Sequence, residues 1–193
     1  MSERGNEELQ HLEETLRSMD EELRQQLKLG LYIDQTSCFS GDCVSGCLPC
    51  VSNQITRFQV FGGSYNDVIN LANAMKGCTC HRLWDISLYG TNMHGHLADL
   101  APLVRPSLEW LELHTCGMDD DDATDLLNIL PAGQVLGWLV LRGNAFSLHA
   151  VKTLTLHLRG LPRLRAFWLG YKGSDADRVK QVAKKNLPNV DYR

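Results

Sequence analysis

A hydrophobic motif that returns at a nearly constant interval constrains this 193-residue chain more than any other feature. Residues 108–118 have the form L-x-x-L-x-L-x-x-C-x-M, and residues 136–146 have the form L-x-x-L-x-L-x-x-N-x-F. Shorter matches begin at Ile55, Leu83 and Leu164, so the starts are separated by 28, 25, 28 and 28 residues. A less complete start lies near residues 27–31. A shared motif at such an interval predicts a repeat architecture over residues 28–193.

Each repeat is expected to contain one short strand and one helix. Alternate side chains of a strand point to opposite faces, so the leucines of L-x-x-L-x-L can enter one core. Helices are predicted over residues 67–75, 119–130 and 148–158, because serine or acidic residues stand at their starts and proline or glycine follows their ends. Such units stacked in one direction predict an α/β fold, a horseshoe-shaped solenoid with a parallel inner sheet and outer helices.

A polar position after the strand pattern is expected to close each turn. Asn144 can hydrogen-bond to the backbone of the turn, whereas Cys116 can do so only weakly. Gly63 and Thr91 occupy this position in earlier repeats. Those two turns are therefore expected to be built differently.

These repeats resemble the leucine-rich repeat family over about residues 28–193. Their length is most similar to the long-repeat branch, typified by ribonuclease inhibitor and by the C-terminal repeat arm of NOD-like receptors. The resemblance implies a ligand-sensing and autoinhibitory arm of an intracellular innate immune receptor. The nucleotide-binding module of that family has no counterpart in this sequence, so ATP binding and oligomerisation are not carried over. A free-standing ubiquitin-ligase adaptor, a ribonuclease-inhibitor-like blocker or a cytoskeletal repeat protein would show the same repeats.

The two ends of the chain carry further helical patterns. Residues 1–27 are predicted to form an amphipathic helix that caps the solenoid or belongs to a partial repeat, with a coiled coil or partner helix as the alternative. Its apolar stripe consists of Leu9, Leu12, Leu16, Met19, Leu23 and Leu27. Residues 175–185 are predicted to be the last helix, and Val190 to begin a short closing strand.

Charge and targeting signals narrow the classes of partner. A net charge of -4 and an isoelectric point near 5.9 argue against nucleic acid or an anionic membrane as the main partner. The N-terminus lacks the pattern of a secretory signal, and no run of about 18 apolar residues exists. We therefore expect a cytoplasmic protein whose seven cysteines are reduced thiols.

Residues that could carry chemistry are few. Residues 38–50 contain four cysteines, and Cys78 and Cys80 follow about one repeat later; zinc and disulfides are the alternatives to inert thiols. The acidic run 119–122 is interpreted as a helix start rather than a cation site. His94 and His96 are expected to lie solvated in a turn. We predict a protein without enzymatic activity, cofactor or metal, although a Cys–His dyad with distant partners stays an alternative.

Strand alternation identifies a candidate binding surface. If the leucines point inward, the third, fifth and seventh positions of each repeat point outward, and aromatic and arginine side chains there are typical of protein interfaces. A one-residue slip, or a C-terminal flank folded back over the face, would bury these side chains instead. The predicted contacts to a protein partner are Arg57, Gln59, Phe61, Asp85, Tyr89, Trp110, Glu112, His114, Trp138, Arg142, Trp168 and Tyr171.

Overall fold

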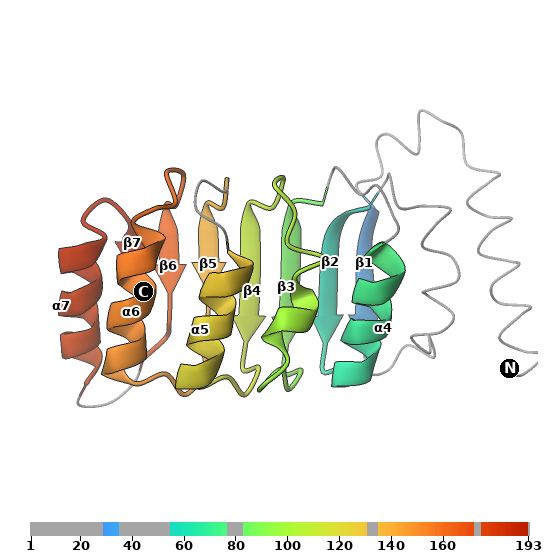
Figure 1. Cartoon of the computed structure of the whole chain (residues 1–193), viewed down its shortest axis with the longest axis horizontal. Coiled ribbons are helices and arrows are strands. Elements are labelled where there is room, and N and C mark those ends of the chain that lie inside the picture. Colours follow the sequence, from blue (N-terminus) through green and yellow to red (C-terminus); the bar gives the residue numbers. More distant parts are fainter. Residues whose placement is uncertain (1–28, 35–54, 77–82, 131–134, 172–174, 193) are drawn as a thin grey trace, which may run out of the picture.

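One parallel sheet organises the protein in a computed structural model (Figure 1). The structure describes residues 29–34, 55–76, 83–130, 135–171 and 175–192. Its seven strands follow one another across the sheet in chain order. They are β1 (Leu29–Asp34), β2 (Ile55–Phe61), β3 (Asp85–Tyr89), β4 (Trp110–His114), β5 (Trp138–Val140), β6 (Ala166–Trp168) and β7 (Asp191–Tyr192). With helices between the strands, this sheet confirms the predicted α/β class.

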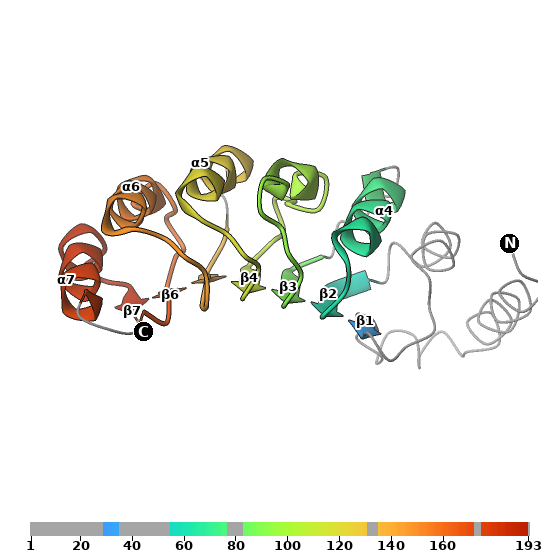
Figure 2. The ribbon, with the colours of Figure 1, turned by 90° about the horizontal axis from the view of Figure 1, so that it is seen from below.

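The helices form a second layer on one side of the sheet, as Figure 2 shows. They are α4 (Tyr65–Lys76), the short 3-10 helix η2 (Leu97–Leu100), α5 (Asp120–Ile129), α6 (Leu148–Leu158) and α7 (Ala176–Asn186). Neighbouring helices contact one another in chain order. Within the described residues, no helix covers the other face of the sheet.

Most predicted helices are confirmed within one or two residues at each end. At the start of α5, the side chain of Asp119 accepts hydrogen bonds from the backbone of Asp121 and Asp122, while Asp122 reaches back to the backbone N–H of Asp119. This reciprocal cap explains the acidic run as a helix start. The 25-residue repeat that begins at Leu83 differs from the others, because it contains only η2 in place of an α-helix.

The strand register is the one that the repeat predicts. Phe58 pairs with Ile86, Ile86 with Leu111, and so on through Leu139 to Phe167. All five side chains are fully buried. A one-residue slip is therefore excluded for β2–β6.

The core lies between the sheet and the helices. Leucines from the strand motif meet apolar side chains that the helices contribute from their inner faces. In the repeat around β4, Leu108, Leu111 and Leu113 are fully buried, and Leu126 of α5 packs in the same cluster with no exposed surface. Burying each such side chain contributes about 2 kcal/mol relative to leaving it in water.

Asn144 closes its turn as predicted. Its side-chain oxygen accepts hydrogen bonds from the backbone N–H groups of Cys116 (2.9 Å) and Met118 (3.2 Å), and its amide nitrogen donates to the carbonyls of Leu113 (2.7 Å) and Leu141 (2.9 Å). One amide thus joins two successive turns. The Sγ of Cys116 lies 3.5 Å from the carbonyl oxygens of Leu88 and His114, long distances that are expected for a weak donor.

A left-handed residue follows the strand in each of five successive repeats, a feature that the sequence analysis missed. Four of these positions are glycines, and Thr115 occupies the fifth with a φ of 54°. At Gly143, an added Cβ would come within 2.6 Å of the Thr115 hydroxyl. Glycine is therefore required there by both backbone conformation and space.

Replacing Asn144 with alanine should destabilise the protein by about 3 kcal/mol, because backbone groups of two turns lose their partner at once. Urea unfolding followed by circular dichroism measures the change. Asn128→Ala, on the exposed side of α5, is the matched control and should change the free energy of unfolding by less than about 0.5 kcal/mol. Equal effects of the two substitutions would contradict a joining role for Asn144.

Candidate partner-binding surface

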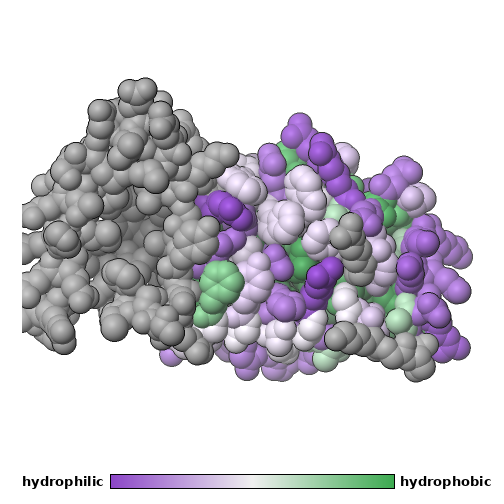
Figure 3. Space-filling view, turned by 180° about the vertical axis from the view of Figure 1, so that it is seen from behind, coloured by the Kyte–Doolittle hydropathy of each residue, from purple (hydrophilic) through white to green (hydrophobic). Residues whose placement is uncertain are grey.

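The third, fifth and seventh repeat positions lie together on the sheet face opposite the helices, which we call the open face. Trp110 pairs with Trp138, and Glu112 pairs with Val140. Figure 3 shows this side of the molecule with near-white and purple atoms and separate small green areas. Tryptophan and tyrosine fall near the middle of that hydropathy scale, so the aromatic character of the face is not visible from its colour.

Three tryptophans form one cluster at the centre of the open face. The rings of Trp110 and Trp138 stack with their centroids 5.6 Å apart and their planes inclined by 26°. Trp168 meets Trp110 edge-on, with a centroid distance of 6.1 Å. All three side chains are half-buried. The expected adjacency of Trp110 and Trp138 is confirmed, and Trp168 joins them from β6.

Arginine side chains lie over these rings. The guanidinium carbon of Arg142 is 5.1 Å from the ring centre of Trp168, and that of Arg165 is 5.7 Å from the ring centre of Trp138. Arg165 was not among the predicted contacts, because it precedes its strand and reaches the face only through its long side chain. Alternation within a strand therefore cannot identify it.

A buried polar group supports the face near β2 and β3. Asp85 is 1% exposed and accepts hydrogen bonds from Arg57 Nε at 2.7 Å and Ser87 Oγ at 2.8 Å. Gln59, also buried, lies 3.4 Å from the same carboxylate. The guanidinium of Arg57 also lies 5.2 Å from the ring centre of Trp84. We therefore assign Asp85 and Gln59 a supporting role beneath Arg57.

Glu112 occupies the middle of the face between aromatic side chains. Its Oε2 accepts hydrogen bonds from the Tyr89 hydroxyl at 2.8 Å and from Trp110 Nε1 at 3.3 Å. Burial and the hydrogen bond to Glu112 raise the pKa of Tyr89 to about 12, so this hydroxyl keeps its proton. Tyr89 also stacks on Phe61 at 4.6 Å and meets His114 edge-on at 5.8 Å.

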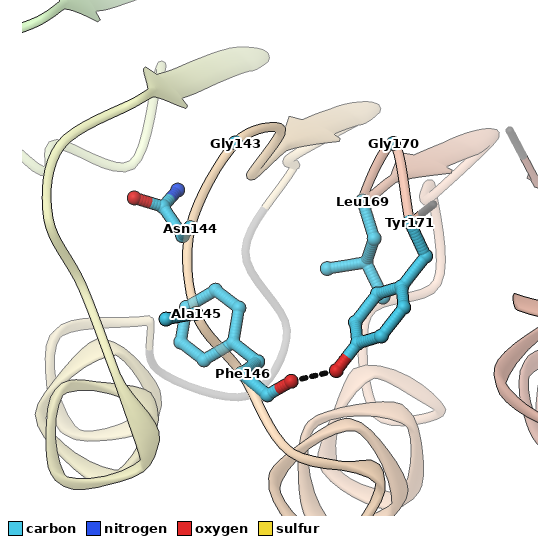
Figure 4. A pocket seen from close by; sticks show the side chains of 7 residues that line it. All are labelled: Gly143, Asn144, Ala145, Phe146, Leu169, Gly170 and Tyr171. Atoms are coloured by element: carbon cyan, nitrogen blue, oxygen red, sulfur yellow. Dashed lines mark hydrogen bonds between the residues drawn. The ribbon is translucent and has the colours of Figure 1, made fainter. Parts of the chain in front are cut away.

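Tyr171 is the predicted contact that lies away from the open face. Its ring packs against the core, and its hydroxyl donates to the carbonyl of Phe146 (Figure 4). A hollow of about 330 Å³ lies between the segment 169–171 and the turn around Asn144. Its main polar groups are already paired with one another or with backbone. We therefore interpret the hollow as the space where two successive repeats meet.

On the helical side, His94 and His96 are exposed at the turn before η2, as predicted, and His94 also joins this turn to the start of α5. Its Nδ1 lies 2.9 Å from Asp122 Oδ2, and Asp122 Oδ1 accepts from the backbone N–H of Gly95 at 2.8 Å. His94, Asp119 and Asp122 could hold a cation by their spacing. Both oxygens of Asp122 already accept N–H donors, however, and the arrangement is explained by the helix cap.

The pKa values of His94 and Asp122 shift in opposite directions. The hydrogen bond to Asp122, with the charges of Asp119 and Asp122, raises the pKa of His94. Burial opposes ionisation of Asp122, but hydrogen bonds from His94 and from the backbone of Gly95 and Asp119 outweigh it, so the pKa of Asp122 is lowered.

The described part of the chain contains one cysteine, Cys116, which is fully buried. Burial raises the pKa of its thiol to about 12. The cysteines of residues 38–50, Cys78, Cys80 and the helix predicted over residues 1–27 lie outside the described residues.

No protein-family model matches the chain, and no curated protein matches it. Among the described helices, none is both long enough and apolar enough to cross a membrane.

The His94–Asp122 joint should make stability depend on pH in a specific way. The contribution of His94 to the free energy of unfolding is complete below its unfolded-state pKa of about 6.5, and it is lost as the pH rises through its raised folded-state pKa. The contribution of Asp122 is present above its unfolded-state pKa of about 3.8 and is lost as the pH falls through its lowered folded-state pKa. The stability advantage of the wild type over His94→Gln should therefore be larger at about pH 5 than at about pH 9.

Chemical unfolding at the two pH values measures that difference. His149→Gln, an exposed position on α6, is the matched control and should show no such change. An advantage of the wild type over His94→Gln that is the same at both pH values would refute the ion pair.

Proposed function

We propose that residues 28–193 form a horseshoe-shaped leucine-rich-repeat module that binds a protein partner on its open face. The observation that carries the proposal is the cluster of Trp110, Trp138 and Trp168 with Arg142 and Arg165 over its rings. These half-buried indoles lie on the side of the sheet away from the core and keep part of their surface open to a partner. Tryptophan, tyrosine and arginine are also the residues most enriched at binding hot spots.

The arrangement of the surface favours a broad partner over a small molecule. The aromatic and charged side chains extend from Phe61 on β2 to Trp168 on β6, and neighbouring strands lie about 4.8 Å apart. A macromolecular surface can contact several of these strands at once. No cofactor or metal is required for such binding.

The repeat length and the strand-then-helix unit support the further proposal that the module is the ligand-sensing and autoinhibitory arm of a cytoplasmic NOD-like receptor. A free-standing adaptor or inhibitor built from the same repeats is the second candidate. A transcript that encodes a nucleotide-binding module upstream of these repeats would favour the receptor. A message that starts at Met1 would favour the adaptor.

Double replacement of Trp110 and Trp138 with alanine should abolish capture of the partner from cell lysate, with a loss of affinity of at least about tenfold. Leu156→Ala, an exposed position on the helical side, is the control and should bind as wild type does. Far-UV circular dichroism and the unfolding midpoint verify that each variant folds. Arg142→Gln serves as a second test because it leaves the tryptophans in place. Unchanged capture by both open-face variants would overturn the proposal, and unfolding of the double variant would identify the tryptophans as core residues.

Cys116 should be inert, which bears on the alternative of a cysteine-dependent enzyme. With its pKa raised to about 12, its thiolate fraction at about pH 8 is of order one in ten thousand. Alkylation of the folded protein, mapped by mass spectrometry, should leave Cys116 unmodified until urea unfolds the chain. Rapid modification of Cys116 in the folded state would instead favour the enzyme.

A further inference from the structure

Among the described residues of the open face, Arg57 is held by both a carboxylate and an indole ring. The guanidinium of Arg57 lies between the carboxylate of Asp85, at 2.7 Å from Nε, and the ring of Trp84, at 5.2 Å from its centre. A carboxylate and an indole together satisfy the charge and the planar face of a guanidinium. The pair also shows which groups this surface uses to hold an arginine.

The same two groups recur on β4 without a cation. Glu112 and Trp110 provide the carboxylate and the indole, and Tyr89 adds a hydroxyl. Both donors bind the same oxygen, Oε2, so they fix the carboxylate while Oε1 has no partner within the described residues. No lysine or arginine of the described residues forms an ion pair with Glu112. The site is therefore oriented by its own neutral donors and still carries its negative charge toward the face.

The other charged groups of the open face are engaged elsewhere and do not occupy this site. Arg142 and Arg165 lie over Trp168 and Trp138, on the β5–β6 side. Asp85 is already neutralised by Arg57. The chain as a whole carries a net charge of -4, which favours the approach of a basic segment over an acidic one.

We propose that Glu112, framed by Trp110 and Tyr89, is the docking point for an arginine side chain of the protein partner. The incoming guanidinium meets the same two kinds of group that hold Arg57, a carboxylate and an indole, with the indole of Trp110 turned so that its N–H donates to the carboxylate. Arginine fits better than lysine, because its planar fork can bind a carboxylate with two N–H groups while it lies against an aromatic ring. This inference rests on the proposed function and specifies the chemistry of the partner at one position.

A titration observed by NMR tests the site in the full chain. The Trp110 indole N–H donates to Glu112, so its resonance, assigned with Trp110→Phe, reports on this carboxylate directly. The probes are three capped tripeptides with arginine, citrulline or glutamate between glycines. Citrulline has the shape of arginine without its charge. Glu112→Gln retains an acceptor oxygen for Tyr89 and Trp110 but removes the charge, and Glu109→Gln, at an exposed position just before β4, makes the same charge change elsewhere.

The arginine peptide should shift the Trp110 resonance saturably, with equal dissociation constants for wild type and Glu109→Gln. Binding should be about tenfold weaker to Glu112→Gln, and about tenfold weaker for the citrulline peptide, because a charge-assisted hydrogen bond is lost in each case. Equal binding of the arginine peptide to Glu112→Gln and wild type would overturn the inference. So would equal binding of citrulline, the absence of a saturable shift at Trp110, or a stronger response to the glutamate peptide.

The outcome is separable from that of the proposed function. If Glu112→Gln binds the arginine peptide as wild type does while the Trp110/Trp138 double variant loses the captured partner, the arginine site is wrong and the binding face stands. If the double variant and Arg142→Gln retain the partner, the binding face itself is wrong, whatever the peptides do.

Discussion

Parallel pairing in constant register is the constraint on which the rest of this structure depends. From β2 to β6, each residue pairs with its counterpart one repeat later, without a shift. One row of side chains therefore enters the core as leucine, isoleucine or phenylalanine, and the next row faces away from the helices. The buried leucines and the tryptophan cluster are two consequences of the same pairing, because a shift of one residue would exchange them.

Polar contacts between repeats hold this register at both edges of the layers. Asn144 binds the backbone of two turns beside the sheet, and Asp122 ties the η2 segment to α5 through His94 and Gly95. Such contacts depend on direction, which apolar packing does not. They keep neighbouring repeats in one relative position, so the fold itself holds the rings of the open face in a fixed arrangement.

The sequence predicted the rows of the sheet because two periods determine them, the repeat length and the alternation along a strand. Trp110 and Trp138 could be placed side by side on that basis alone. The ends of long side chains could not be placed, because their direction depends on neighbours in other repeats. Arg165 reaches Trp138 from outside the strand, Tyr171 turns toward the core, and His94 reaches Asp122 across 28 residues. The sequence thus predicts which side chains share a row across the sheet, but not which of them contact one another.

The short repeat that begins at Leu83 separates two kinds of change that such a chain can tolerate. It is three residues shorter than its neighbours and contains η2 in place of an α-helix, yet β3 and β4 pair in the same register as β2 and β3. Insertions and deletions are thus accommodated on the helical side, while the rows of side chains on the open face stay aligned. Evolution can therefore vary the length of the scaffold on one side and exchange single side chains on the other, so the chemistry of the open face can diverge without a new fold.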